Sequence, residues 1–284
     1  MVQKTVLITG SSEGGIGDAL AKEFHKNGLR VFATARNLAK VLHLKDMGLE
    51  VLKLDVTDDA SIKQAVEEVK ALTGGTLDFL VNNSGGGYNL PMLDTTVADA
   101  RKLFDLNVFA LVAVTQAFAP LLVASKGTVI NIGSVAGITP MPWQGYYNAT
   151  KAAVALITDN MRIEMAPWGV KFINVITGGV KSRFFENLVA QHLPSNSLYL
   201  PAKDEIEPMM NGSLVKKNAL DVDVYAKRVV ANALKSNPKV HFWAGSEIWT
   251  IWLVDTFGWS TIWGMVMSKL VNMPLVSRKI KAAE

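Results

Sequence analysis

Cysteine is absent from this chain of 284 residues. Its absence excludes disulfides, cysteine-ligated zinc, iron–sulfur clusters and thiol nucleophiles. Histidine is scarce, and the four histidines are scattered without the close pairing of a metal site. The net charge of +4 is too small and too evenly spread to predict nucleic-acid binding. We therefore expect neither a metal ion nor a nucleic acid as a partner.

We expect no secretory signal, and low-complexity tracts are also missing from the sequence. A strand-like run already begins at residue 4, where a signal peptide would carry its own pattern. Hydrophobic residues make up 49% of the chain, which is enough to fill a large core and excludes a disordered chain. The composition predicts a globular enzyme of the cytoplasm.

Short apolar runs alternate with longer amphipathic stretches. This alternation is typical of βαβ units and predicts an α/β fold, a doubly wound parallel sheet with helices on both faces. We expect strands at 4–9, 30–35, 50–55, 78–82, 127–132, 170–175 and 240–243, and helices near 16–28, 59–72, 97–125, 144–168 and 221–236. The segment 183–220 breaks this rhythm. It is polar and loop-like with three prolines, so we expect a substrate lid there.

A glycine-rich turn joins the first expected strand to the first expected helix. Gly10 allows a tight turn, and Gly15 and Gly17 let the backbone approach a pyrophosphate at the N-terminus of the helix that begins at Ile16. Taken alone, such a turn is a weak signal, because glycine clusters are more often plain loops. Its place in the first βα unit favours a dinucleotide site.

The end of the second strand indicates which dinucleotide binds. A site for NAD would place Asp or Glu there to bind the ribose 2′-hydroxyl, but this chain has Ala35 followed by Arg36. A guanidinium suits a 2′-phosphate, and Ser11 and Ser12 in the adjacent turn add hydroxyl donors. We therefore predict NADPH/NADP+ as the cofactor. The alternative is that Arg36 is a solvated loop residue.

Two further strand ends carry candidate cofactor contacts. Asp55 and Val56 follow the third strand, and Asn82, Ser84 and Gly85 follow the fourth. Ligands bind beyond the carboxyl ends of the strands in open α/β sheets, so we assign these residues to the cofactor site. Asp55 could equally be the N-cap of the next helix.

A candidate catalytic group follows the fifth strand. Ser134 stands after the strand end, Tyr147 comes thirteen residues later, and Lys151 four residues after that. The i,i+4 spacing puts Tyr147 and Lys151 on one helix face, where an ammonium is expected to lower the pKa of the phenol from about 10 toward the working pH. Tyr146 is the competing tyrosine, but no lysine lies four residues after it.

Over roughly residues 4–245, the sequence resembles the short-chain dehydrogenase/reductase family. The motifs that carry the resemblance are Thr9-Gly10…Gly15-Ile16-Gly17, Asn82-Asn83-Ser84-Gly85, Asn107, Ser134, and Tyr147 with Lys151. The resemblance implies that Tyr147 gives a proton to a carbonyl oxygen that Ser134 holds. It also implies that Lys151 lowers the pKa of Tyr147 and binds the nicotinamide ribose, while Asn107 anchors a water relay. Without the resemblance, Asn107 would be interpreted as a helical residue whose side chain forms hydrogen bonds within the protein.

Three positions depart from the usual family pattern. The first turn has one extra residue, Ser84 replaces an alanine, and Thr177-Gly178 replaces Pro-Gly after the sixth strand. The family's equivalent loop holds the nicotinamide amide, so the resemblance implies cofactor contacts for Thr177, Gly178, Val180 and Ser182. The lost proline is expected to loosen the loop slightly. These departures are similar to those of one branch of the family, the NADPH-dependent 1-acyldihydroxyacetone-phosphate reductases, in which many enzymes act on other ketones.

Tryptophan is concentrated near the C-terminus. Five of the seven tryptophans lie between 243 and 263, and the spacing of four of them predicts one shared helix face: Trp249, Trp252, Trp259 and Trp263. The apolar run 248–267 has spanning length, but Asp255 and Gly258 argue against a true span. The basic residues that follow suit a peripheral contact with anionic lipid. The alternatives are packing on a sister subunit or a roof over the substrate pocket.

The sequence thus predicts a catalytic domain with the Rossmann fold over 1–245, including the lid, and a helical extension over 246–284. The predicted activity is NADPH-dependent reduction of a bulky hydrophobic or lipid-like ketone to a secondary alcohol. The sequence does not decide between two kinds of reductase: one that acts on acyldihydroxyacetone phosphate, and a ketoreductase of secondary metabolism. Apolar residues of the lid favour such a substrate: Phe184, Phe185, Leu188, Leu198 and Tyr199. A phosphate ester would also need a cation, for which Lys181 or Arg183 is available.

Two other kinds of function remain open at this point. One is a non-catalytic nucleotide-binding protein on the same fold, which would have no need of Ser134, Tyr147 and Lys151. The other is a membrane-docked structural protein whose tail is its main feature. For the enzyme we expect a homodimer or homotetramer.

Overall fold

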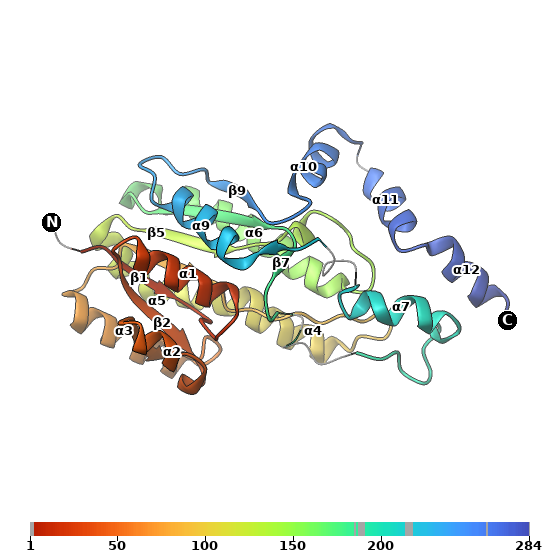
Figure 1. Ribbon diagram of the computed structural model, residues 1–284, viewed down its shortest axis with the longest axis horizontal. Helices are drawn as coiled ribbons and strands as arrows, with labels where there is room; N and C mark the ends of the chain where they lie inside the picture. Colours follow the sequence, from red (N-terminus) through yellow and green to blue (C-terminus); the bar gives the residue numbers. More distant parts are fainter. Residues whose placement is uncertain (1–2, 185, 187–190, 214–217, 260, 284) are drawn as a thin grey trace.

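The computed structural model describes residues 3–184, 186, 191–213, 218–259 and 261–283. Seven strands form one sheet in the order β3-β2-β1-β4-β5-β6-β9, and all six neighbouring pairs are parallel (Figure 1). The strands are β1 (Thr5–Ile8), β2 (Arg30–Ala35), β3 (Glu50–Lys53), β4 (Phe79–Asn82), β5 (Thr128–Ile132), β6 (Lys171–Thr177) and β9 (His241–Ala244). The strand order reverses between β1 and β4, which confirms the predicted doubly wound Rossmann fold.

The predicted strands match the observed ones within about two residues at each end. Strands β1, β4 and β5 are buried along their whole length, and this is why they read as continuous apolar runs in the sequence. Two short strands, β7 (Val180–Lys181) and β8 (Leu220–Asp221), form a separate parallel pair that the sequence did not predict. Two residues per strand leave no periodic pattern to detect.

Helices cover both faces of the sheet. On one face, α1 (Ile16–Lys26) packs against α9 (Val222–Ala233), and their fully buried Phe24 and Tyr225 belong to the same core cluster. On the other face, α3 (Asp59–Thr73) packs against α5 (Ala110–Ser125), with Phe118 and Phe172 in a second cluster. Helix α6 (Gly145–Glu164) contacts β6, and the short α2 (Leu42–Asp46) follows β2.

One long helical stretch, Val97–Ser125, is apolar and long enough to cross a membrane by length and composition. It consists of α4 (Val97–Phe104), a π-helical turn (Asp105–Phe109) and α5. Its side chains Val114, Phe118 and Leu122 are buried in the core cluster beneath the sheet. A helix that is apolar on most sides is either buried in protein or seated in lipid, and these contacts identify a core helix.

The predicted lid segment contains a helix that the sequence did not reveal. A 3-10 turn (Leu200–Ala202) leads into α7 (Lys203–Met210), which continues past Pro208. Ile206 and Met210 are buried, and their burial outweighs the hydrogen bond that proline removes. Phe185 and Leu188, which the sequence assigns to the lid, lie outside the described residues.

The C-terminal extension is an arm of three helices, not one. They are α10 (Ile248–Phe257), α11 (Ile262–Leu270) and α12 (Met273–Lys281), and the arm leads away from the sheet until α12 lies beside α7 (Figure 1). The chain turns at Gly258, which has an extended backbone and where a Cβ would lie 2.4 Å from the Val254 carbonyl oxygen. The shared tryptophan face predicted for one continuous helix is therefore wrong. The apolar run 248–267 is divided between α10 and α11 and does not form one continuous helix.

Candidate active site

The glycine-rich turn after β1 is shaped by close backbone packing. Gly10 has φ +71°, and a Cβ on Gly17 would lie 2.4 Å from the Gly10 carbonyl oxygen. Gly15 is the N-cap of α1 and provides no side-chain hydrogen bond to its first N–H groups, which begin with Ile16. These groups remain available to an anion such as a pyrophosphate.

Only one of the two predicted serine donors is positioned to serve a ligand. Ser11 is fully buried, and its hydroxyl donates to the Ile8 carbonyl oxygen at 3.1 Å. The prediction of Ser11 as a hydroxyl donor to the cofactor is wrong, because the strand end already uses that hydroxyl. Ser12 is half-buried, and its hydroxyl has no partner within the described part of the chain.

Arg36 and Asp55 lie near each other at the ends of β2 and β3. The Arg36 side chain is exposed and makes no ion pair among the described residues. Burial acts to raise the pKa of Asp55, but hydrogen bonds from Thr57 and the charge of Arg36 lower it overall, so the carboxylate is ionised. Asp58, not Asp55, caps α3, so the N-cap alternative for Asp55 is wrong. Val56 beside it is buried.

The end of β4 carries a polar network. The Asn82 side chain donates to Thr115 and to Asn131, both at 2.9 Å, so its amide group serves the interior of the protein rather than a ligand. Asn83, to which the sequence assigned no contact of its own, donates to the carbonyl oxygens of Thr9 at 3.0 Å and Gly10 at 2.9 Å. It fixes the glycine-rich turn against the end of β4, where Ser84 and the exposed Gly85 follow.

Tyr147 and Ser134 meet at the carboxyl edge of the sheet. Tyr147 is in the first turn of α6, Ser134 follows β5, and the two hydroxyl groups form a hydrogen bond. Burial raises the pKa of Tyr147 to about 12, and the hydrogen bond to Ser134 opposes this only in part. The Phe184 ring lies 6.2 Å from the Tyr147 ring, centroid to centroid. Tyr147 is thus a protonated phenol that can act as a proton donor.

Lys151 lies one helical turn beyond Tyr147. Its Nζ donates to the Ile132 carbonyl oxygen at 2.9 Å and lies 5.8 Å from the Tyr147 ring centroid. Burial lowers the pKa of Lys151 to about 8. The expected net fall in the pKa of Tyr147 is wrong, because burial of the phenol outweighs the nearby ammonium, which donates to the Ile132 carbonyl oxygen.

Asn107 lies in the π-helical turn and is completely hydrogen-bonded. Its Nδ2 donates to the Gly86 carbonyl oxygen at 2.9 Å and to Thr150 Oγ1 at 3.1 Å, while its Oδ1 accepts from the Gly86 N–H at 2.8 Å. Thr150 in turn donates to the Tyr147 carbonyl oxygen at 2.8 Å. Asn107 thus joins the loop after β4 to the helix that carries Tyr147. Such π-turns often occur at functional sites.

The loop after β6 is held more tightly than expected from its missing proline. Thr177 Oγ1 hydrogen-bonds with the hydroxyl of buried Tyr225 at 2.8 Å. A Cβ on Gly178 would lie 2.2 Å from the Ser246 carbonyl oxygen. Val180 is buried in the core and Ser182 is half-buried. The side chains of Thr177 and Val180 face the protein, so any cofactor contact from these two residues comes from their backbone.

Arg183 lies over the glycine-rich turn. A Cβ on Gly14 would be 2.9 Å from Arg183 Cδ, and the Arg183 N–H donates to the Gly14 carbonyl oxygen at 3.1 Å. The guanidinium also lies within 4.0 Å of Glu13 and 3.8 Å of Glu186. This arginine therefore belongs to the cofactor side of the site, which corrects its assignment to a substrate phosphate.

An apolar cluster, here called the roof cluster, lies above this edge of the sheet. Its members come from segments that follow β4, β5 and β6 and from α12 at the C-terminus. They are Leu90, Trp143, Leu193, Ala202, Ile206, Met210 and Val276, with Tyr88, Tyr199, Met209, Met273 and Ile280 packed against them. Among the predicted lid residues, Tyr199 joins the roof cluster, while Leu198 is 72% exposed.

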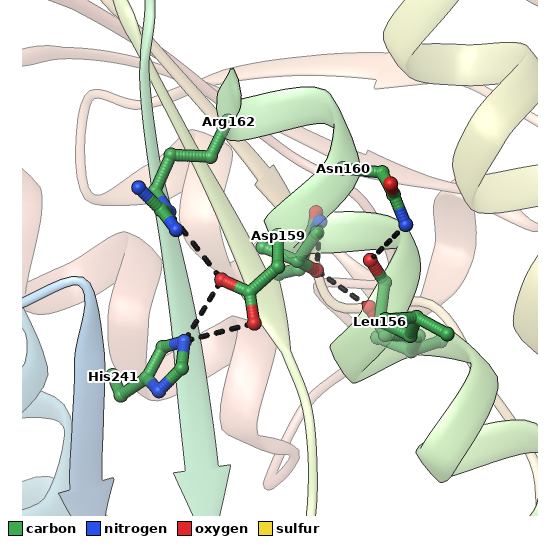
Figure 2. Close-up of polar contacts among 8 residues, drawn as sticks. Leu156, Asp159, Asn160, Arg162 and His241 are labelled. Atoms are coloured by element: carbon green, nitrogen blue, oxygen red, sulfur yellow. Dashed lines mark hydrogen bonds and ion pairs between the residues drawn. The ribbon is translucent and has the colours of Figure 1, made fainter. Parts of the chain in front are cut away.

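The far end of α6 serves a structural purpose. Asp159 accepts from Arg162 at 3.3 Å and from His241 of β9 at 2.9 Å, and Asn160 donates to the Leu156 carbonyl oxygen (Figure 2). These contacts fasten the edge strand β9 to α6. In the described residues no group of three or more His, Cys, Asp or Glu side chains could hold a metal ion.

Comparison with known proteins places this architecture in a family. A family model described as short chain dehydrogenase matches residues 4–193. A short-chain dehydrogenase from Penicillium crustosum is 40% identical over 255 residues, covering 89% of this chain and 93% of that protein. An NADPH-dependent 1-acyldihydroxyacetone phosphate reductase from Schizosaccharomyces pombe is 39% identical over 203 residues, covering 70% of this chain and 69% of that one.

A solved structure agrees with these relatives. A short-chain dehydrogenase from Streptomyces avermitilis superposes with a TM-score of 0.79 and 28% identity over 98% of both chains. The chain therefore belongs to the short-chain dehydrogenase family and is an oxidoreductase of the kind that uses a nicotinamide cofactor.

Proposed function

We propose that this protein is an NADPH-dependent reductase that converts the ketone of a bulky, largely apolar substrate into a secondary alcohol. One observation carries the proposal. Tyr147 is held protonated and hydrogen-bonded to Ser134 at the carboxyl edge of the sheet, and apolar segments that follow the same strand ends form the roof cluster.

The residues at the end of β1 and β2 fit a phosphorylated dinucleotide. The turn leaves no room for a Cβ at Gly17, and the N-terminus of α1 lacks a side-chain cap. Ser12 and Arg36 make no side-chain hydrogen bond or ion pair in the described residues, so a hydroxyl and a guanidinium remain for a 2′-phosphate. The NADPH dependence of the fission-yeast relative supports the same choice.

The chain's own residues perform the proton chemistry. When bound, the reduced nicotinamide supplies a hydride to the carbonyl carbon. Ser134 donates a hydrogen bond to the carbonyl oxygen, and Tyr147 gives its phenolic proton to that oxygen, which completes the alcohol. The positive charge of Lys151, below a pH of about 8, stabilises the tyrosinate that remains. We assign the backbone of Asn107 as the anchor of a water relay that returns the proton, because its side chain already bonds to Gly86 and Thr150.

The surroundings favour an uncharged substrate. Beside the roof cluster, Lys279 pairs with Glu205 at 2.6 Å, and His192 contacts Glu207 at 3.1 Å. Arg183 lies on the cofactor side, and Lys181 is exposed on β7. A neutral polycyclic or other bulky ketone therefore fits better than a phosphate ester.

An acyldihydroxyacetone phosphate is the second candidate substrate, because the relative that reduces it is 39% identical. Consumption of NADPH is measured with this ester and with a panel of neutral polycyclic ketones, in the wild type and in a Lys181→Gln variant. The proposal expects the neutral ketones to be reduced best. A preferred phosphate ester whose reduction collapses in the variant would favour the second candidate. Reduction of neither class would refute the reductase assignment.

Three further proposals concern how the protein is arranged and placed. Residues 1–245 form the catalytic unit, and 246–284 form an extension that docks through α12. A second copy of the chain covers the exposed apolar side chains of the long helical stretch Val97–Ser125 and of α6, which include Phe109 and Leu156.

The enzyme works in the cytoplasm, with the exposed face of α10 and α11 against an intracellular lipid surface.

A further inference from the structure

Trp143 combines two unusual features. Its φ is +69°, in the left-handed region that a bulky side chain rarely adopts. Its side chain is only 8% exposed, and the indole Nε1 is buried without a hydrogen-bond partner. Pro142 precedes it, and a proline followed by a left-handed residue is the arrangement of a type II turn, in which glycine or asparagine causes less strain.

The position of Trp143 connects these features to the active site. It lies between β5 and α6, four residues before Tyr147. Its ring packs edge-on against Tyr199 with 5.2 Å between the centroids, and it shares the roof cluster with Leu90 and Leu193. These neighbours follow β4 and β6, so Trp143 belongs to the apolar wall at the edge of the sheet where ligands bind in this fold.

A buried N–H without an acceptor is costly, and backbone strain adds to that cost. Phenylalanine would fill much of the same space without the unpaired donor. The protein therefore carries at this position an uncharged hydrogen-bond donor in an apolar surrounding. Such a donor suits a neutral oxygen and does not supply the charge that a phosphate needs.

We propose that Trp143 Nε1 donates a hydrogen bond to a second, uncharged oxygen of the substrate, separate from the carbonyl that Tyr147 protonates. This inference rests on the proposed ketone reductase function and narrows its substrate class. The substrate is a bulky apolar ketone that carries a further carbonyl, ether or hydroxyl oxygen, and Trp143 determines specificity for that oxygen.

The test compares Trp143→Phe with the wild type on matched ketones. The substrates are a bicyclic monoketone such as decalone and the decalin-diones, which share its skeleton and add a second carbonyl. We expect the wild type to prefer at least one dione by about tenfold or more in kcat/KM, because one buried hydrogen bond contributes about that factor. In Trp143→Phe this preference disappears, because kcat/KM falls by about tenfold more for that dione than for decalone.

Trp168→Phe is the matched control, because Trp168 is 55% exposed and lies outside the roof cluster. A second readout needs no turnover: the indole N–H resonance that is lost in Trp143→Phe should shift when a dione binds to the complex with NADP+. Equal losses on decalone and the diones, or an unchanged preference and an unmoved resonance, would overturn the inference. If the wild type reduces neither ketone while the resonance still shifts, the proposed reaction fails and the donor role stands.

Discussion

Lys279 of α12 forms an ion pair of 2.6 Å with Glu205 of α7. The contact joins α12 to α7, the helix within the predicted lid segment. Val276 of α12 is buried in the roof cluster. The sequence left open whether the tail contacts lipid, a sister subunit or the substrate pocket. In the structure, α12 packs against the roof cluster and α7.

This pair predicts that the tail affects substrate binding. Lys279→Ala leaves the Glu205 carboxylate, whose Oε2 is already buried and unpartnered, without its cation. Because the pair is partly exposed, we expect its loss to weaken the binding of an apolar ketone by about 1 kcal/mol. The KM for that ketone should therefore rise about fivefold, while the affinity for NADPH is unchanged. Lys281→Ala, on the same helix and exposed, is the control. Equal KM values for the two variants would contradict the role of the pair.

The exposed face of α10 and α11 is predicted to bind anionic lipid. Trp249 is 72% exposed and Phe257 75%, and basic residues such as Lys269 follow. Co-sedimentation with vesicles that contain anionic lipid should fall several-fold in Trp249→Ser, Phe257→Ser, with ketone reduction maintained. Binding that is equal for both proteins, or loss of a dimer in place of lipid binding, would show that this face meets something else.

Cofactor choice is predicted to depend on Arg36. A charge-assisted contact with a 2′-phosphate contributes roughly 1.5–3 kcal/mol, so NADPH should be preferred over NADH by more than about tenfold in affinity. Arg36→Ala should lose this preference through weaker NADPH binding and leave NADH binding unchanged. Both dissociation constants can be measured by fluorescence. A wild type that uses NADH equally well would refute the assignment.

The lowered pKa of Lys151 predicts two effects of pH. As pH rises through about 8, the ammonium loses its proton, so kcat/KM for ketone reduction should fall. Stability should show the opposite trend. The unfolded chain holds this proton up to a pKa of 10.5, while the folded chain releases it near 8, so the free energy of unfolding rises with pH between these values.

Lys151→Met separates this effect from other titrations. The variant should lack that rise in the free energy of unfolding between about pH 8 and 10, measured with urea at several pH values. The raised pKa of Tyr147 affects stability only above pH 10, so the window is clear of it. The same slope in both proteins would show that Lys151 does not titrate in this range.

The sequence predicts the sheet and the grouping of Ser134, Tyr147 and Lys151 well because their signals are local. Buried strands such as β1 and β4 appear in the sequence as continuous apolar runs. The i,i+4 spacing of Tyr147 and Lys151 predicts that both side chains lie on one face of a helix. The sequence does not predict the helix α7, because Pro208 and the polar residues around it weaken the helical pattern. Only the packing of Ile206 and Met210 in the roof cluster shows which face of the helix is buried. The break at Gly258 depends on one close approach to the Val254 carbonyl oxygen, which no periodicity reveals.

Side-chain direction is the second limit of sequence reasoning. The sequence gives no reason to distinguish Ser11 from Ser12. In the structure the Ser11 hydroxyl donates to the Ile8 carbonyl oxygen in the core, while the Ser12 hydroxyl remains available to a ligand. Arg183 is adjacent to the substrate loop in sequence, but its side chain lies over Gly14. The pKa values of Tyr147 and Lys151 depend on burial, which the sequence does not contain.

The central claim is that Tyr147, aided by Ser134, protonates a ketone oxygen, and one pair of variants tests it most directly. Tyr147→Phe keeps the ring and removes the proton donor, so turnover of the best neutral ketone with NADPH should fall by about 10²–10⁴-fold while NADPH binding is unchanged. Tyr146→Phe, one residue earlier, should retain turnover. An active Tyr147→Phe beside an inactive Tyr146→Phe would contradict the account.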